Sequence, residues 1–173
     1  MNRRELETLL LTLESTPALV ARAAEGLEPW QVRRAPAPGS FSLVEHVWHL
    51  ADIEREGYGM RIRRILAEQD PVLADFDGER IARERQYNQR DLATGLAALA
   101  AARARNVEKL RRCIHNSDWK RRGVQDGVGP ITLEDVPRMM AGHDRAHTEE
   151  IANLVAHLKE GKPFEAHPSF AVA

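Results

Sequence analysis

The sequence predicts an all-α fold, a four-helix bundle with long connections between its helices. Ala, Leu, Arg and Glu dominate the 173 residues, and runs of β-branched residues are scarce, which favours helices over strands. Pro and Gly gather at only a few places, and these places divide the chain into four long segments. Because the connections are too long for simple hairpins, we expect the four segments to pack as a bundle.

The first helix is expected at about residues 3–26, where Gly26 is a stop signal. Pro17 cannot donate a hydrogen bond to the preceding turn, so a kink or a restart is expected there. The apolar side chains recur at helical spacing, at Leu6, Leu9, Leu10 and Leu13. Residues 28–40 hold several prolines and are expected to form a loop.

The second helix is expected at about residues 43–68. Ser42 and Glu45 have the spacing of a capping box. In this motif the serine hydroxyl accepts a hydrogen bond from the glutamate amide, and the glutamate carboxylate accepts one from the serine amide. The sequence therefore predicts a well-defined helix start immediately after Ser42.

The second half of the chain is expected to contain two further long helices. Residues 71–88 are polar and irregular, with a short helix at about 78–85, and a third long helix fits residues 91–114. Residues 116–130 are expected to form a loop.

The fourth helix is expected to be capped by Thr132 and to end near Gly161. Pro137 falls within its first turns and predicts a late start or a kink. A short tail, residues 163–173, follows this helix.

Composition limits the class of protein. The length predicts one domain over residues 1–173, with its core at about 5–160, and a net charge of −1 argues against bulk nucleic-acid binding. The single cysteine excludes an intramolecular disulfide and a cysteine-rich zinc site. No apolar run approaches the roughly 18 residues of a membrane span, and the N-terminus lacks the layout of a secretory signal. We therefore expect a cytoplasmic protein that binds neither membranes nor nucleic acids.

Two histidines of the fourth helix belong to its apolar stripe. His143 and His147 are spaced i, i+4, so both imidazoles lie on one face about one turn apart. One metal ion can accept a nitrogen from each at about 2.0–2.1 Å, and it supplies the polar partner that buried imidazoles need. Two partly exposed histidines on a helix edge are the alternative. The other members of the stripe are Val136, Met140, Ile151, Leu154 and Leu158.

The second helix carries another pair, His46 and His49, beside its own apolar stripe. Either histidine could face the fourth helix, and the helical wheel alone does not choose between them. The alternative is one core histidine with satisfied hydrogen bonds and one at the surface. Because metal ligands are neutral imidazoles, we expect metal to be lost as the histidines protonate near pH 6.5.

Two segments resemble the signatures of the DinB-like (damage-inducible B) superfamily. Residues 41–52, FSLVEHVWHLAD, resemble an aromatic-Ser pair that opens a helix, followed by His-Leu seven residues after the serine. Residues 142–151, GHDRAHTEEI, resemble a His-Asp-x-x-His motif that continues into an apolar helix. The loop at 118–133 is similar to the family's lead-in to its last helix. The resemblance extends over about residues 6–159.

This resemblance implies a four-helix bundle with a three-histidine site for a divalent metal. Carried over by position, the ligands are His49, His143 and His147, because the seven-residue step from Ser42 selects His49. The resemblance also implies a small-molecule substrate, a metal-dependent hydrolase or a transferase that uses a low-molecular-weight thiol, and a homodimer. The chain departs from the usual pattern in having phenylalanine where tryptophan is common and in carrying the additional His46.

Several carboxylates near the histidines are candidates for supporting roles. Glu150 is the candidate catalytic residue, and it either orients a histidine or acts as a base near metal-bound water. An exposed helix carboxylate is the alternative. Asp52 and Glu54 follow His49 and suggest the same supporting role. Asp144 is expected at the surface or between helices rather than at the metal.

Three imidazoles leave at least one coordination position for water or a thiolate, whose pKa the metal lowers. Zinc or nickel suits imidazole ligands best. The sequence therefore predicts a metal-dependent hydrolase or a thiol-dependent transferase, and the alternative is a dimeric bundle that binds metal or ligand without turnover. Cys113 is expected to be a packing residue, and the remaining histidines to be structural or exposed: His115, His157 and His167.

Overall fold

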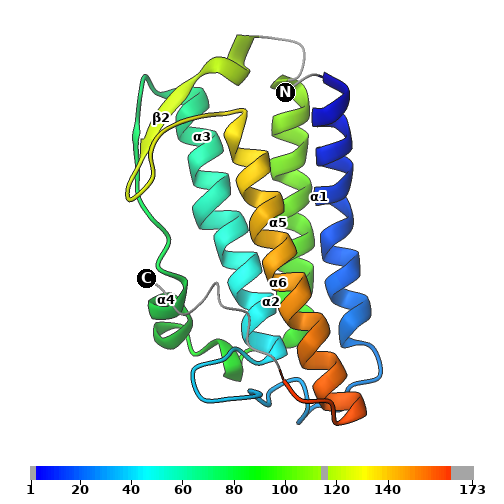
Figure 1. Cartoon of the computed structure of the whole chain (residues 1–173). Coiled ribbons are helices and arrows are strands. Elements are labelled where there is room, and N and C mark those ends of the chain that lie inside the picture. The colour runs from blue at the N-terminus through cyan, green and yellow to red at the C-terminus, as the bar shows by residue number, and fades with distance from the viewer. Residues whose placement is uncertain (1–2, 114–116, 165–173) are drawn as a thin grey trace.

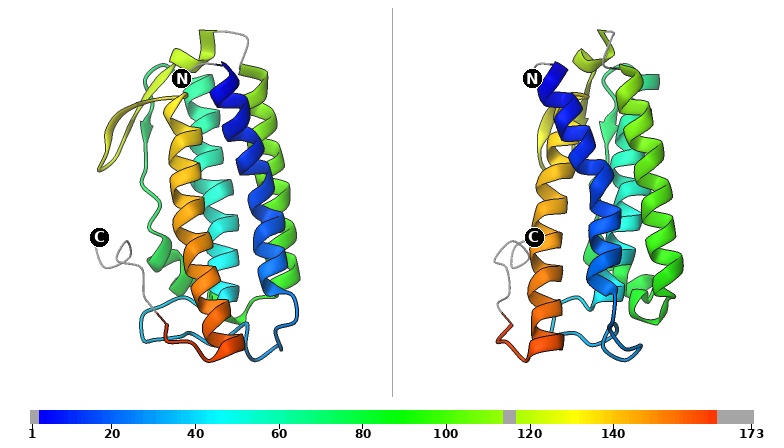
Figure 2. Two further views of the ribbon diagram at one scale, coloured as in Figure 1. Left: turned by 45° about the vertical axis from the view of Figure 1, so that its right-hand side comes forward. Right: turned by 90° about the vertical axis from the view of Figure 1, so that its right-hand side faces the viewer.

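Four long helical rods run side by side in the computed structural model, which describes residues 3–113 and 117–164 (Figures 1 and 2). The first rod is α1 (Arg3–Ala24), the third is α5 (Leu92–Cys113) and the fourth is α6 (Asp135–Glu160). The second rod is composite and extends from Leu43 to Ala67. As Figure 2 shows, α1 and α6 run in one direction and the other two rods in the opposite direction. The predicted all-α four-helix bundle is confirmed.

The second rod consists of α2 (Leu43–Asp52), a π-helical segment η1 (Ile53–Tyr58) and α3 (Gly59–Ala67). It begins at the predicted capping box. The π-helical segment was not predicted. Within it, the amide of Gly59 donates to the carbonyl of Glu54, and Asn106 Nδ2 donates to the same carbonyl at 2.7 Å. The Asn106 side chain on α5 therefore stabilises the wider turn.

The first helix continues through Pro17 without a break, so the expected restart is wrong. The proline removes the amide that would have donated to the carbonyl of Leu13. In the structure, Arg103 on α5 donates from a guanidinium nitrogen to this carbonyl at 2.8 Å. A side chain from a neighbouring rod thus supplies the missing hydrogen bond.

A small sheet lies beside the α3 end of the bundle, where the sequence predicted only a loop at 116–130 (Figure 1). Its strands are β1 (Val72–Leu73), β2 (Arg122–Gln125) and β3 (Gly129–Thr132). β1 pairs with β2 in parallel, and β2 pairs with β3 in antiparallel orientation. The remaining short elements are α4 (Gly78–Glu84), η2 (Tyr87–Gln89) and η3 (Ser117–Lys120).

The start and end of α6 follow from its flanking residues. The helix begins at Asp135 with Glu134 as its N-cap residue, so the late start predicted from Pro137 is confirmed. The predicted cap by Thr132 is wrong, because its amide and hydroxyl both donate to Asp135 Oδ2, at 2.8 and 2.7 Å. Pro137 then falls in the first turn, where its missing amide costs no helical hydrogen bond. The helix ends as predicted at Gly161, which has a left-handed φ of 66°.

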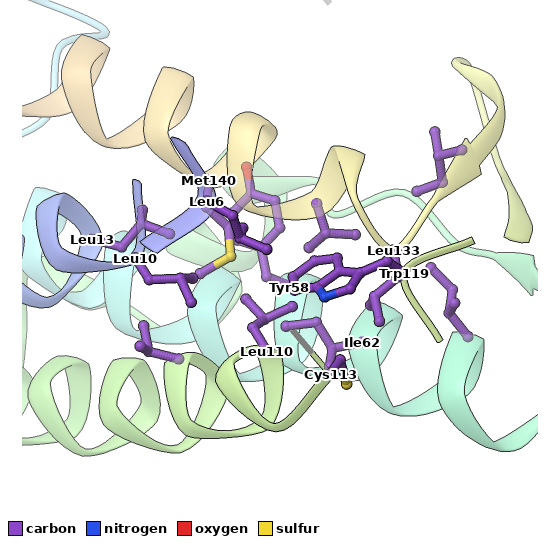
Figure 3. Packing of buried hydrophobic residues seen from close by; sticks show 14 of the residues in the cluster. Leu6, Leu10, Leu13, Tyr58, Ile62, Leu110, Cys113, Trp119, Leu133 and Met140 are labelled. Carbon is purple, nitrogen blue, oxygen red and sulfur yellow. The ribbon is translucent and has the colours of Figure 1, made fainter. Parts of the chain in front are cut away.

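The core consists of two apolar clusters. The first joins all four rods near the sheet, and Figure 3 shows Leu10, Tyr58, Leu110 and Met140 meeting within it. The second cluster surrounds α2 and includes Ile151 of α6. Along α6, both candidate histidines lie between Met140 of the first cluster and Ile151 of the second. Among the described residues, no helix is long and apolar enough to cross a membrane.

Candidate metal centre

Helix α6 places both of its candidate histidines on the inward face of the bundle. His147 is fully buried at 0 % exposure, and His143 one turn earlier is half-buried. Helix α2 contributes the third candidate, His49, which is 5 % exposed. The capping box fixes where α2 begins, because Ser42 donates its amide to Glu45 Oε2 at 2.8 Å.

The Nε2 atoms of the three histidines converge. His143 Nε2 lies 3.1 Å from His49 Nε2 and 3.2 Å from His147 Nε2. Nitrogens bound at 2.0–2.1 Å to one tetrahedral ion lie about 3.3 Å apart, close to these separations. Among the described residues, two groups could hold a metal ion, and they share His147. One of them consists of the three residues selected by the family resemblance.

Hydrogen bonding alone does not account for this arrangement. A neutral imidazole has one N–H donor and one lone pair, so His143 Nε2 can serve only one of its two nitrogen neighbours well. The Nδ1 atoms of His49 and His143 are buried and have no hydrogen-bond partner among the described residues. A metal ion binds all three Nε2 lone pairs at once, and the donor set therefore fits a divalent cation.

Aromatic rings and a glycine close around His49. The rings of Phe41 and Phe76 lie with their centroids 5.6 and 6.0 Å from that of His49. A Cβ atom added to Gly78, the first residue of α4, would lie 2.4 Å from His49 Cε1 and 2.6 Å from Nδ1. Only glycine leaves room for the imidazole in this position.

Burial keeps the histidines of this region neutral. It lowers the pKa of His46 and of His49 to about 3 and that of His143 to about 4, because the protonated rings would lose hydration. The pKa of His147 lies well below 6.5, first because of burial and then because of the neighbouring histidines. Neutral imidazole is the form that binds a metal, so the site is ready for one over a wide pH range.

The helical wheel did not decide whether His46 or His49 faces the fourth helix. The Nδ1 atom of His46 lies 3.0 Å from Nδ1 of His147, and the His46 ring is nearly perpendicular to that ring, at 75°. His46 is 3 % exposed, so both histidines of α2 are buried. His49 joins the three Nε2 atoms, whereas His46 contacts the other nitrogen of His147.

Glu150 lies next to this second contact. Its Oε2 atom is 3.8 Å from His46 Nε2 and 3.9 Å from His147 Nδ1. Burial raises the pKa of Glu150 to about 7, and its side chain is 11 % exposed, so it is not an exposed helix carboxylate. Both separations are longer than a hydrogen bond, so the expected role of orienting a histidine stays a prediction. The catalytic role of Glu150 stays a prediction.

Asp144 belongs to a buried ion-pair network between helices. Arg103 donates to both carboxylate oxygens of Asp144, at 2.6 and 2.8 Å, and pairs with Glu54 at 2.9 Å. The hydroxyl of Thr16 on α1 donates to Asp144 Oδ2 at 2.8 Å. The expected position of Asp144 between helices is confirmed, and Glu54 pairs with Arg103 and not with a histidine.

The supporting role expected for Asp52 beside His49 is wrong as well. The Asp52 carboxylate is fully buried, and it accepts hydrogen bonds from Tyr87 Oη at 2.6 Å, from Arg55 at 2.8 Å and from Arg85. Asp52 comes three residues after His49, so its side chain lies about 60° around the helix from that of His49. It faces Tyr87 of η2 and Arg85 at the end of α4.

Cys113 and His157 lie away from the histidine site. Cys113 is buried in the first apolar cluster, as expected of a packing residue. His157 Nδ1 contacts the carbonyl of Lys162 at 2.8 Å near the end of α6. His115 and His167 lie outside the described residues.

Two curated relatives match nearly the whole chain. A Bacillus licheniformis protein is 27 % identical over 159 residues, which cover 91 % of this chain and 88 % of the relative. YfiT from Bacillus subtilis is 24 % identical over 155 residues, which cover 89 % of this chain and 86 % of YfiT. Both relatives carry the name "putative metal-dependent hydrolase".

The solved structure of Bacillus subtilis YfiT has the same fold. It matches 93 % of this chain and 90 % of its own chain with a TM-score of 0.81, at 23 % sequence identity, and it is described as an unusual four-helix bundle. The sequence profile of the DinB superfamily matches residues 12–151, which include the second rod and all three converging histidines. This chain therefore belongs to the DinB superfamily.

Proposed function

We propose that this protein is a metal-dependent hydrolase of a small molecule, with one divalent ion held by His49, His143 and His147. The observation that carries the proposal is the convergence of three Nε2 atoms, at 3.1 and 3.2 Å, among buried and neutral imidazoles. The names of the two curated relatives support the hydrolase class.

The chain's own residues keep the candidate ligands neutral and largely covered. Burial keeps the ligands unprotonated, while Phe41 and Phe76 cover His49 and limit its access to water. A divalent ion held by three imidazoles would supply Lewis-acid chemistry and would lower the pKa of a water molecule to about 7. Glu150 lies beside His46 Nε2 and His147 Nδ1 rather than beside the converging Nε2 atoms, and its proposed role is to orient these histidines.

Zinc and nickel are the proposed metals, because imidazole nitrogen is a good ligand for both. A transferase that uses a low-molecular-weight thiol would need the same ion, with a thiolate in the place of water. The two reactions differ in one requirement, since hydrolysis proceeds without added thiol.

The test uses untagged protein, stripped with a chelator and reloaded with zinc or nickel. Hydrolysis of a panel of small esters, amides and lactams is measured with and without a thiol. The proposal predicts turnover that depends on the metal, does not need the thiol, and is lost in His143→Ala but kept in His157→Ala. Metal-loaded protein that turns over only thiol conjugates would contradict the hydrolase proposal.

A further inference from the structure

The three candidate ligands differ in the hydrogen-bond partner of Nδ1, the ring nitrogen that does not face the proposed metal. Nδ1 of His49 and Nδ1 of His143 have no hydrogen-bond partner among the described residues. Nδ1 of His147, in contrast, lies 3.0 Å from Nδ1 of His46, a normal hydrogen-bond distance. Metal-binding histidines usually donate their other N–H to a partner that fixes tautomer and ring orientation. Here the partner is another buried histidine.

The direction of this hydrogen bond follows from the position of the metal site. With the Nε2 lone pair of His147 directed at His49 and His143, the proton of the neutral ring resides on Nδ1. His147 is then the donor, and His46 Nδ1 must be the acceptor. The proton of His46 consequently resides on its Nε2 atom, which faces Glu150 Oε2 at 3.8 Å.

We propose that His46 is a positioning residue that selects the metal-binding tautomer of His147 and fixes the orientation of its ring. This inference rests on the proposed metal centre. Its support is the 3.0 Å contact, the 3 % exposure of His46, and the carboxylate of Glu150 on the far side of the His46 ring. The family resemblance assigns His46 no role.

The alternative is that these residues form a second metal site. The potential ligand atoms of His46, His147 and Glu150 also lie close enough together to hold one ion. If both sites were filled at once, His147 would need a lone pair on each nitrogen, which means an imidazolate ring that has lost its one N–H proton. A direct hydrogen bond between the two Nδ1 atoms needs only neutral rings. The two uses differ in stoichiometry, because a positioning role predicts about one ion per chain and a second site predicts about two.

Two substitutions at position 46 separate hydrogen bonding from packing. In His46→Asn the side-chain oxygen can occupy the position of Nδ1 and accept the hydrogen bond from His147. In His46→Leu the volume is kept, but the acceptor is lost. If His46 acts only by packing, the apolar leucine is tolerated at least as well as asparagine in this buried position.

The readout is the dissociation constant for zinc at pH 7.5, measured on the full chain by competition with a chromogenic chelator. We expect His46→Leu to bind zinc about 10–100-fold more weakly than the wild type, the usual effect of losing such a partner. We expect His46→Asn to retain the affinity within about threefold. In the zinc-loaded protein, ¹⁵N NMR should show a proton on His147 Nδ1 in the wild type and in His46→Asn.

The matched control is His157→Leu, which should leave the affinity unchanged, because His157 contacts Lys162 and Phe164 of the segment that follows α6. If His46→Leu does not fold, His46→Gln replaces it, since the glutamine amide reaches the position of Nε2 rather than Nδ1. Equal zinc affinity in the wild type and His46→Leu would overturn the inference, as would uptake of about two zinc ions per chain. A wild type that takes up no zinc contradicts the proposed function itself.

Discussion

At the scale of single residues, His147 is the ligand with the strongest structural support, because it is fully buried and both of its ring nitrogens face other histidines. We expect His147→Ala to abolish metal binding, since two imidazoles are too few for a tight site. The bundle should remain folded, because truncation at one buried position costs roughly 1–3 kcal/mol. Metal analysis and thermal unfolding of the variant measure both effects.

The control for this substitution is His157→Ala, ten residues later on α6. It should change neither metal content nor melting temperature by a measurable amount. Full metal occupancy in His147→Ala would show that His147 is not a ligand. Complete unfolding would show that the metal-binding residues are mainly structural, which would weaken the case for an enzyme.

Gly78 offers a test of the space around His49. A methyl group at this position would meet the imidazole at 2.4–2.6 Å, so Gly78→Ala should displace the His49 ring and weaken zinc binding at least tenfold. The matched control is Gly142→Ala, next to His143, where an added Cβ meets nothing within 4 Å. That control should leave zinc affinity unchanged and stabilise α6 by about 1 kcal/mol. Equal affinities in the two variants would contradict the observed packing.

The buried histidines predict how the stability of the metal-free protein depends on pH. Their pKa values are lowered to about 3 or 4 in the folded chain, whereas in the unfolded chain they are about 6.5. Below pH 6.5 the unfolded state therefore binds more protons, and the free energy of unfolding falls by about 1.4 kcal/mol per pH unit for each histidine that stays neutral. Glu150, with its raised pKa, acts in the opposite direction between about pH 4.5 and 7, but it is a single group.

Urea unfolding of chelator-treated protein at pH 7.5, 6.5 and 5.5 measures this dependence. Stability should fall slightly between pH 7.5 and 6.5, where the histidines of the unfolded chain become half protonated, and more steeply between pH 6.5 and 5.5. The same lowered pKa values correct the expectation of metal loss near pH 6.5, because the folded ligands stay neutral well below that pH. A metal-free protein equally stable at pH 5.5 and 7.5 would contradict the burial of these rings.

At the scale of helices, one side chain connects all four rods. Arg103 on α5 binds the Leu13 carbonyl on α1, Glu54 on the second rod and Asp144 on α6. Arg103→Met should cost about 3–5 kcal/mol of unfolding free energy, because it leaves two buried carboxylates without their cation. Urea unfolding measures the loss. The control is Arg111→Met on the same helix, which breaks an exposed pair with Glu14 and should cost at most about 1 kcal/mol. Equal losses would contradict the network.

Local sequence patterns predicted where the helical rods begin and end. They did not predict the continuity of α1 through Pro17 or the π-helical segment of the second rod. The capping box at Ser42 and the glycine at 161 act on backbone groups a few residues away. A short stretch of sequence is therefore enough to predict these two helix ends. The continuity of α1 through Pro17 depends on Arg103, and the π-helical segment depends on Asn106. Both partners come from a distant part of the chain, which periodicity does not detect.

The small sheet had a local signal that the prediction of a loop overlooked. Asp126-Gly127 is a hairpin dipeptide, and β2 alternates exposed and buried residues before it. Gly127 and Gly129 both have positive φ values, 73° and 99°, as a tight hairpin requires. The strands are short, however, and β1 joins from residues 72–73, a pairing that no local pattern indicates.

At the scale of the whole molecule, the site depends on how α2 is rotated against α6. The i, i+4 spacing predicted that the imidazoles of His143 and His147 lie on one face of the helix, and this is confirmed by their Nε2 contact at 3.2 Å. The choice of His49 over His46 came from the family resemblance, because the helical wheel left both on one shoulder. In the structure both face His147, and each contacts a different side of the site. The homodimer and the cytoplasmic location stay predictions.

The central claim is that three histidines hold one catalytic ion, and X-ray absorption on untagged, zinc-loaded protein tests it most directly. Metal analysis of the same sample gives the stoichiometry. We predict about one divalent ion per chain, with three imidazole nitrogens at about 2.0–2.1 Å and at least one further light ligand. Protein that retains no zinc after dialysis, or an ion with fewer than three imidazole ligands, would contradict the proposed centre.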